Sequence, residues 1–243
     1  MGITGCSWKR NQNMAEHSES FFAMDTYMTF TAYGMDAEAA VLAAEDKIRE
    51  LEALWSVTDE NSDIYAVNHS AGQTVTIDQK TAELVSFALD MAEKTNGVLE
   101  PTIYPVLTAW GFTTGENRIP TEIELAGLLD KVGYEKVKLN ENQIQTEPGS
   151  MIDMGAVGKG YAGDEAAQVL RERGITAALL DIGGNIQAIG TKPDGSDWRV
   201  GLKDPFSGNV LGIFQISDMA VVTSGNYERF FCRRRWQNKW TYR

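Results

Sequence analysis

The chain has 243 residues and a net charge of −12, and 43% of its residues are hydrophobic. This composition is typical of soluble globular proteins, excludes a fibrous or disordered chain, and allows one large domain or two small ones. The acidic balance argues against nucleic-acid binding, which needs Lys and Arg to replace counterions, and the two His and two Cys argue against a zinc or iron centre.

The N-terminus contains Ile3-Thr4-Gly5-Cys6, which resembles the bacterial lipobox that exposes a cysteine for lipid attachment. The basic and apolar regions that usually precede a lipobox are absent here, so a chance match stays open. We expect residues 1–20 to form a lipobox-like segment and a polar tether. The expected location is the cell envelope, on the extracytoplasmic face of the inner or plasma membrane, with a lipid anchor on Cys6.

The folded part is expected to begin near Phe21 and to combine short strands with amphipathic helices. Asp36 is a good N-cap, and apolar residues then recur at helical spacing to about Leu54. Further helices are predicted over 81–94, 122–129 and 163–173. Strands are predicted over 28–33, 74–77, 137–139, 143–146, 177–182, 186–190, 198–202, 211–216 and 220–223. The interval 101–112 is predicted to be an aromatic, proline-punctuated loop, and the fold class is α+β with a mostly antiparallel sheet and packed helices.

Three glycine-rich turns are candidates for ligand binding: 153–161 (DMGAVGKGY), 181–185 (DIGGN) and 223–227 (TSGNY). Glycines let a backbone approach a ligand closely, and amides at a helix start favour phosphate. The first turn also supplies Lys159, although it lacks the Walker A spacing. Without a ligand, a tight strand-to-helix connection explains the first segment and a strand-to-loop turn explains the third equally well. For the second segment, a hairpin with glycines at positive φ is the favoured interpretation.

Taken together, six ordered blocks resemble the ApbE family of FAD:protein FMN transferases over about residues 21–231. The blocks are MDTYMTFTAYG, SDIYAVN, NGVLEPTIYPVLTAWGF, IDMGAVGKGYAGD, LLDIGGNIQAIGTKPDGSDWRVGLKDP and VVTSGNYERFF. The resemblance implies an α+β, T-fold-related architecture with FAD bound in a cleft. It also implies transfer of the FMN half of FAD to a Thr or Ser hydroxyl of a partner flavoprotein, with release of AMP and assistance from Mg²⁺. The implied acceptor is a domain of a membrane redox complex or a secreted reductase.

By position, the resemblance assigns site residues but no catalytic base. The residues assigned to FAD are Met24, Thr58, Val98, Leu99, Glu100, Asp153 and Lys159. Ala156 would offer its backbone carbonyl to magnesium, which suits a hard cation. Glu100 and Thr58 occupy positions where relatives vary, so they carry less weight. Displacement at a pyrophosphate needs a positioned hydroxyl and neutralised phosphate charge, which Lys159 and Mg²⁺ fit.

The chain departs from the family pattern after Phe231, where it reads CRRRWQNKWTYR. We expect residues 232–243 to be a basic tail outside the family domain of residues 21–231, which would be incomplete at its C-terminus. The His-Ile, Asp-Pro and Thr-Gly segment and the distal acidic and threonine ligands of magnesium are not found. A frameshift would explain this, since suitable codons for the tail encode VEDGGKTNGHI in another frame; a natural basic tail is the alternative. The 243-residue form is therefore expected to have weak or no transferase activity.

Two other functions stay open from the sequence. A non-catalytic flavin-binding or FAD-carrier lipoprotein would keep the cleft without the chemistry. A structural lipoprotein without a ligand would show no stabilisation by flavin, whereas any binder is stabilised by RT ln(1 + [L]/Kd), where [L] is the free ligand concentration.

Overall fold

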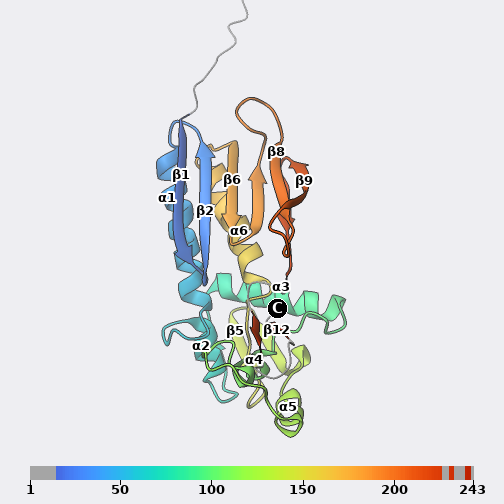
Figure 1. The fold of residues 1–243 in the computed structure, drawn as a ribbon. Coiled ribbons are helices and arrows are strands. Elements are labelled where there is room, and N and C mark those ends of the chain that lie inside the picture. Colours follow the sequence, from blue (N-terminus) through green and yellow to red (C-terminus); the bar gives the residue numbers. More distant parts are fainter. Residues whose placement is uncertain (1–14, 226–229, 233–238, 242–243) are drawn as a thin grey trace, which may run out of the picture.

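The computed structural model describes residues 15–225, 230–232 and 239–241. Its main element is a five-stranded sheet in the order β1-β2-β6-β7-β10, in which every neighbouring pair is antiparallel (Figure 1). These strands are β1 (Glu16–Ala23), β2 (Thr26–Tyr33), β6 (Ala177–Ile182), β7 (Asn185–Ile189) and β10 (Ala220–Val222). The β1–β2 and β6–β7 pairs are hairpins, whereas the β2–β6 and β7–β10 pairs join distant parts of the chain.

Two long helices, α1 (Ala37–Trp55) and α6 (Gly158–Glu172), cover one face of this sheet. The apolar residues of α1 recur at three- and four-residue intervals and are buried, as are Ala162, Ala166 and Leu170 of α6. Alternate residues of β6, Ala178, Leu180 and Ile182, complete this main core. The helix faces and the sheet face are thus fixed by the periodicities of 3.6 and 2 in the sequence.

The opposite face of the sheet carries a second, smaller core. Trp198 and Val200 of β8 (Trp198–Lys203) and Ile216 of β9 (Val210–Ile216) pack there against Ala177 and Ala188. Strands β8 and β9 form an antiparallel pair with a register shift at Leu202 and Lys203. Most of β9 stays exposed, including four large apolar side chains: Val210, Leu211, Ile213 and Phe214.

The other end of the molecule contains a small three-stranded sheet in the order β3-β5-β4 and four helices. The elements are α2 (Asp63–Asn68), β3 (Val75–Thr76), α3 (Gln79–Lys94), α4 (Tyr104–Trp110), α5 (Glu122–Leu129), a 3-10 turn η1 (Tyr134–Lys136), β4 (Val137–Asn140) and β5 (Gln143–Thr146). Helix α3 lies between this part and the large sheet (Figure 1). The strands β11 (Phe230–Cys232) and β12 (Lys239–Thr241) form a separate antiparallel pair.

Four details differ from the sequence expectations. Residues 104–110 form α4 rather than a loop, and its Pro105 occupies the first turn, where a missing N–H costs nothing. Helix α6 begins five residues before the predicted 163. Residues 63–68, for which no helix was predicted, form the short helix α2. The sheet begins at Glu16, so the boundary expected at residue 20 falls within β1. Cys6, the expected lipid attachment site, lies outside the described residues.

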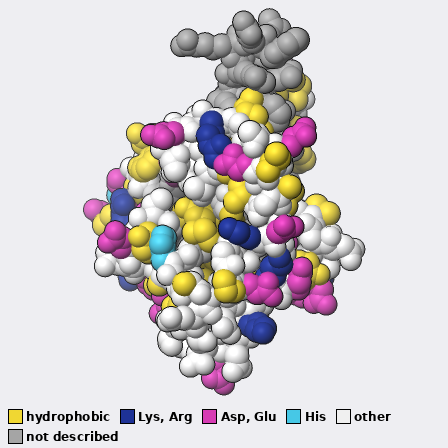
Figure 2. All heavy atoms as spheres, turned by 90° about the horizontal axis from the view of Figure 1, so that it is seen from below, with side chains coloured by type: hydrophobic (Ala, Val, Ile, Leu, Met, Phe, Trp, Pro, Cys, Tyr) yellow, Lys and Arg dark blue, Asp and Glu magenta, His cyan; other side chains and the backbone are white. Residues whose placement is uncertain are grey.

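Within the residues that the structure describes, no helix is long and apolar enough to cross a membrane. Figure 2 shows the molecule from the end that carries the small sheet. Acidic and basic side chains lie next to one another over much of this face, and apolar side chains lie near its middle. Charges of both signs are thus interspersed on this surface.

Candidate functional site

A cavity of about 610 Å³ lies where four separate segments of the chain meet. It is lined by the turn between β1 and β2, the end of α1 with the turn that follows it, the residues after α4, and the start of α6. The lining residues are Met24, Asp25, Glu52, Trp55, Ser56, Val57, Thr58, Phe112, Thr113, Asp153, Met154, Gly155, Gly158 and Lys159. A space of this size suits a small-molecule ligand.

The β1–β2 turn carries Met24 and Asp25, both in the left-handed region with φ values of 49° and 57°. Two consecutive residues with positive φ are the signature of a tight type I′ hairpin turn, which usually contains Gly or Asn. The backbone N–H of Met24 donates to Oε1 of Glu52 at 2.6 Å. A carboxylate from α1 therefore holds the turn against the wall of the cavity.

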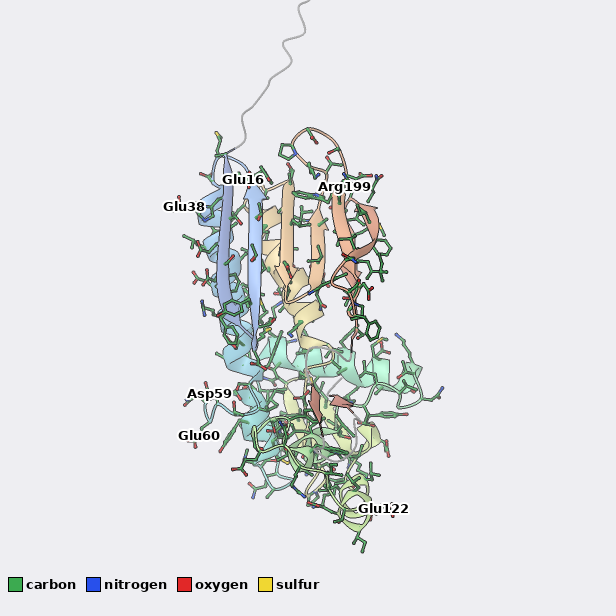
Figure 3. All side chains as sticks on the ribbon, viewed as in Figure 1. Glu16, Glu38, Asp59, Glu60, Glu122 and Arg199 are labelled. Atoms are coloured by element: carbon green, nitrogen blue, oxygen red, sulfur yellow. The ribbon has the colours of Figure 1, made fainter. Side chains whose placement is uncertain are left out.

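The turn after α1 is held by its own hydroxyl groups. Ser56 Oγ accepts the N–H of Thr58 at 3.2 Å and the N–H of Asp59 at 3.0 Å. The buried Ser62, which caps α2, donates its hydroxyl to the Ser56 carbonyl. Figure 3 shows Asp59 and Glu60 on the outer side of this turn, while Thr58 lines the cavity.

The start of α6 presents backbone amides and a basic side chain. Asp153 is fixed from both sides: its N–H donates to the Pro101 carbonyl at 2.8 Å, and its Oδ1 accepts the Gly155 N–H at 2.8 Å. The helix begins at Gly158, and Lys159 follows within its first turn. A helix N-terminus carries partial positive charge, so this wall favours a phosphate or another anion.

The rest of the lining is apolar and aromatic. Trp55, Phe112, Met24 and Met154 supply flat or polarisable surface that suits a planar ring system. Trp55 is 7% exposed, and its Nε1 has no hydrogen-bond partner among the described residues.

Four of the eight residues assigned from the sequence meet in this cavity, namely Met24, Thr58, Asp153 and Lys159. The structure does not bring the other four, Val98, Leu99, Glu100 and Ala156, into the lining. Val98 is 88% exposed, and the Leu99 N–H donates to Thr95 Oγ1 at 3.0 Å. Ala156 is exposed beside Gly155, which does line the cavity.

Glu100 has structural partners instead. Its Oε1 accepts the N–H and the hydroxyl of Thr102 at 2.9 and 2.6 Å, and its Oε2 accepts the Tyr134 N–H at 3.1 Å. Thr102 is fully buried. The carboxylate thus joins the segment before α4 to η1.

Several residues that line the cavity were not predicted as site residues from the sequence, among them Asp25, Glu52, Trp55 and Phe112. Trp55 ends the apolar stripe of α1, and such a stripe by itself predicts a core position. Phe112 follows a helix that was predicted to be a loop. The sequence offers one indication for Trp55: a tryptophan at the end of a helix beside a polar turn is well placed to line a cavity.

The architecture and the cavity together define an α+β protein with a cleft that is lined by aromatic side chains and by the start of a helix with Lys159. A family model described as the ApbE family matches residues 24–241. This chain belongs to the ApbE family. The matched range includes part of the segment that was expected to lie outside the domain.

Similar proteins agree with this assignment. A Klebsiella pneumoniae FAD:protein FMN transferase is 28% identical over 230 residues, covering 91% of this chain and 71% of the relative. A Treponema pallidum protein of the same name is 28% identical, covering 96% of this chain and 70% of the relative. The crystal structure of an ApbE protein from Thermotoga maritima superposes with a TM-score of 0.89 at 28% identity, covering 94% of this chain and 75% of that one. The predicted α+β, ApbE-like fold class is confirmed.

Proposed function

We propose that the protein binds FAD in this cavity and transfers its FMN half to a Thr or Ser hydroxyl of a partner flavoprotein. The relatives named FAD:protein FMN transferases support this reaction. The observation that carries the proposal is the meeting of Met24, Thr58, Asp153 and Lys159 in one cavity at the start of α6. The aromatic wall suits the flavin ring, and the helix start suits the pyrophosphate.

In the proposed reaction, the acceptor oxygen forms a bond to the phosphorus of the FMN phosphate. The bond from that phosphorus to the bridging oxygen breaks, AMP leaves with this oxygen, and the hydroxyl proton is released. Lys159 and the amides at the start of α6 would stabilise the negative charge on the phosphate oxygens. Asp153, held by Pro101 and Gly155, would keep this turn in place. No described residue is assigned as the base.

Magnesium assistance is part of the proposal, with the Ala156 carbonyl as one oxygen ligand. Among the residues that the structure describes, no group of three or more His, Cys, Asp or Glu could hold a metal ion. Mg²⁺ usually binds one or two carboxylates together with substrate phosphates, and no step above depends on the metal. Because the chain departs from the family pattern after Phe231, we propose that transfer by the 243-residue form is weak.

The partner and the location extend the same proposal. A flavoprotein acceptor follows from the reaction, and we propose that it is a domain of a membrane redox complex or a secreted reductase. Attachment through a lipid on Cys6 would bring the enzyme to the extracytoplasmic side of the membrane. Metabolic labelling with a fatty acid, compared between the native chain and Cys6→Ser, tests the anchor; equal labelling of both would contradict it.

Titration of the purified chain with FAD, followed by addition of an acceptor domain and assay of AMP, tests the main proposal. Lys159→Met should raise the Kd for FAD about tenfold, because one charge-assisted contact is lost. Lys94→Met, which removes an exposed lysine at the end of α3, is the matched control and should leave the Kd unchanged. Absence of FAD binding by the native chain, or equal effects of the two variants, would overturn the assignment of the cavity.

One outcome would favour the alternative function. FAD binding that depends on Lys159, without AMP release under any condition that includes Mg²⁺ and acceptor, would indicate a non-catalytic FAD carrier. The cavity would then have the same ligand but not the transfer chemistry.

A further inference from the structure

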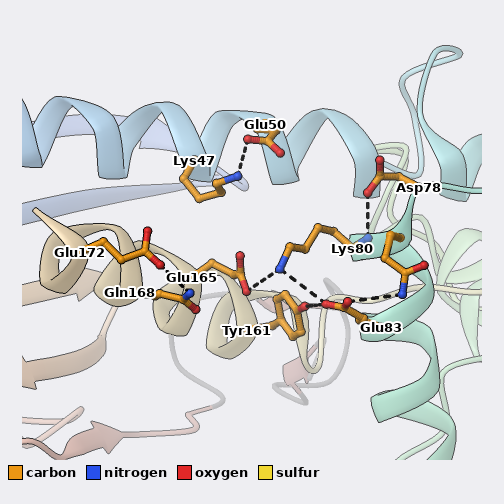
Figure 4. Close-up of polar contacts among 10 residues, drawn as sticks. Lys47, Glu50, Asp78, Lys80, Glu83, Tyr161, Glu165, Gln168 and Glu172 are labelled. Carbon is orange, nitrogen blue, oxygen red and sulfur yellow. Dashed lines mark hydrogen bonds and ion pairs between the residues drawn. The ribbon is translucent and has the colours of Figure 1, made fainter.

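A polar cluster joins α3 to α6 beside the cavity, and we name its members Lys80, Glu83, Tyr161 and Glu165 the α3–α6 cluster (Figure 4). Lys80 Nζ lies 3.0 Å from Glu165 Oε1 and 3.5 Å from Glu83 Oε2. The hydroxyl of Tyr161 donates to Glu83 Oε2 at 2.6 Å. None of the four residues lines the cavity.

Tyr161 connects this cluster to the cavity wall. Its ring meets the Trp55 indole edge to face, with centroids 5.6 Å apart and an interplanar angle of 81°. Trp55 also lies against the first turn of α6, since a Cβ on Gly158 would be 3.7 Å from Trp55 Cε3. Trp55 therefore both lines the cavity and packs against the Tyr161 ring.

The hydrogen bond between Tyr161 and Glu83 is expected to persist over a wide pH range. Burial, together with the Glu83 carboxylate, raises the pKa of the Tyr161 hydroxyl, so it stays protonated and able to donate. The same bond lowers the pKa of Glu83, whose carboxylate stays ionised as the acceptor. A hydrogen bond to an ionised acceptor is stronger than one between neutral groups. Helix α3 thus fixes the position of the Tyr161 ring.

We propose that Tyr161 is a positioning residue, which holds the Trp55 wall and the first turn of α6 in the geometry that binds flavin. This inference rests on the proposed function, because it concerns the affinity of the same cavity for FAD. Because the Tyr161 ring packs against Trp55, which lines the cavity, a shift of this ring would move the aromatic wall. Tyr161 itself does not line the cavity.

The test compares three variants that separate the ring from the hydrogen bond. Tyr161→Leu removes both and should raise the Kd for FAD about tenfold, whereas Tyr161→Phe keeps the edge-to-face contact and should raise it about threefold. Lys80→Met removes the ion pairs of the cluster but leaves Tyr161 bonded to Glu83 and in contact with Trp55. It should change the Kd less than about twofold, because partly exposed ion pairs contribute little.

A spectroscopic signature distinguishes positioning from a general loss of stability. Tyr161→Leu should alter the near-UV circular dichroism of tryptophan, and this change should disappear in a Trp55→Phe background. The double-mutant cycle of the two positions should show that their effects on the Kd are coupled. Glu83→Gln serves as a second route if Tyr161→Leu does not fold, and should resemble Tyr161→Phe.

The outcomes separate the two proposals. If the native chain binds FAD and Tyr161→Leu binds it equally well, or if Lys80→Met weakens binding as much as Tyr161→Leu, the positioning role is wrong while the proposed function stands. If the native chain binds no FAD, the proposed function fails and the positioning role fails with it.

Discussion

The backbone N–H of Met24 donates to the carboxylate of Glu52 at 2.6 Å and thereby joins the β1–β2 turn to the end of α1. Both residues line the cavity. Met24 and the following Asp25 have positive φ values, a conformation that costs non-glycine residues about 1 kcal/mol or more each. The turn therefore depends on a contact made from outside it.

Glu52→Ala should release this turn and weaken FAD binding. A hydrogen bond to a charged acceptor contributes about 1.5–3 kcal/mol, so the Kd should rise about tenfold if part of that energy holds the turn in its binding geometry. Titration of FAD against the intrinsic fluorescence measures the effect. Glu50→Ala, which breaks only the surface pair with Lys47, is the control. Unchanged affinity in Glu52→Ala would show that the cavity does not need this turn.

The glycine turn between β6 and β7 gives a second prediction. Gly183 and Gly184 both have positive φ values, at 62° and 91°, as expected for a hairpin with glycines at positive φ. A Cβ on Gly183 would collide with the Thr26 side chain, whereas one on Gly184 meets no atom within 4 Å. Gly183→Ala should therefore destabilise the protein by about 3 kcal/mol, and Gly184→Ala by about 1 kcal/mol.

Urea unfolding of the two alanine variants measures this difference directly. Because Thr26 follows Asp25 of the cavity wall, Gly183→Ala should also weaken FAD binding, while Gly184→Ala should not. Equal destabilisation by the two substitutions would mean that Thr26 moves aside without cost.

The amphipathic elements of the fold could be predicted from the sequence because each carries its own periodicity. Helix α1 and strand β6 are examples: buried residues recur along them at the spacing that their own geometry imposes. Helix α4 could not be predicted, because the two prolines and the aromatic residues of the interval 101–112 suggest a loop. Its Pro105 is compatible with a helix only at the first turn, and the position of that turn is set by packing.

The candidate site was predictable only in part, for a similar reason. Lys159 and Asp153 belong to a glycine-rich turn that local chemistry marks as a possible anion site. Glu52 and Phe112 come from elements with no local sign of function, and only the tertiary arrangement brings them to the cavity. Glu100 is the opposite example. It lies in a block that resembles the ApbE family and was therefore assigned to FAD binding, but in the structure its carboxylate accepts hydrogen bonds from backbone and hydroxyl groups.

We expect Asp218 to contribute to the loss of folding stability at acidic pH. Its carboxylate accepts the Gly190 N–H at 2.9 Å and lies 3.3 Å from Arg171, and these contacts, the Gly190 bond first, lower its pKa below the usual 3.8. A lowered pKa in the folded state means that the contribution is fully present above pH 3.8 and is lost as the pH falls through the folded-state value.

Asp218→Asn should abolish this contribution while keeping the positive φ of 49° that Asn tolerates. Urea unfolding should then show the native chain more stable than the variant near neutral pH, with the difference shrinking below pH 3.8. Arg171→Gln removes only the weaker cause and should reduce the pH dependence without abolishing it. A difference between native chain and Asp218→Asn that is constant from neutral pH into acid would contradict the prediction.

Because β9 carries exposed apolar side chains, we expect copies of the protein to associate through this strand. Leu211 is 65% exposed and Phe214 is 46% exposed, and exposed apolar strands favour contacts between molecules. Replacing both by Thr keeps the β propensity and should reduce the apparent mass in concentration-dependent light scattering. Stability should change by less than about 1 kcal/mol because neither side chain is buried. Equal association of the native chain and the variant would place the contact elsewhere.

The last prediction decides between the two roles of Glu100, as a ligand of FAD and as a structural carboxylate. Glu100→Ala leaves the fully buried Thr102 hydroxyl and the Tyr134 N–H without their acceptor. It should therefore destabilise the protein by about 3 kcal/mol. The folded fraction should bind FAD with a Kd within about twofold of the native value, because the carboxylate does not line the cavity.

Asp153→Asn provides the opposite pattern and serves as the matched variant. It keeps the Oδ1 that accepts the Gly155 N–H, so its stability should fall by less than about 1 kcal/mol. It removes a charge that lines the cavity, so the Kd for FAD should change severalfold. Calorimetric titration with FAD and urea unfolding, applied to both variants, separate binding from stability. If Glu100→Ala raises the Kd tenfold while leaving stability intact, Glu100 binds the flavin in a conformation other than this one, and the cavity wall extends to the segment before α4.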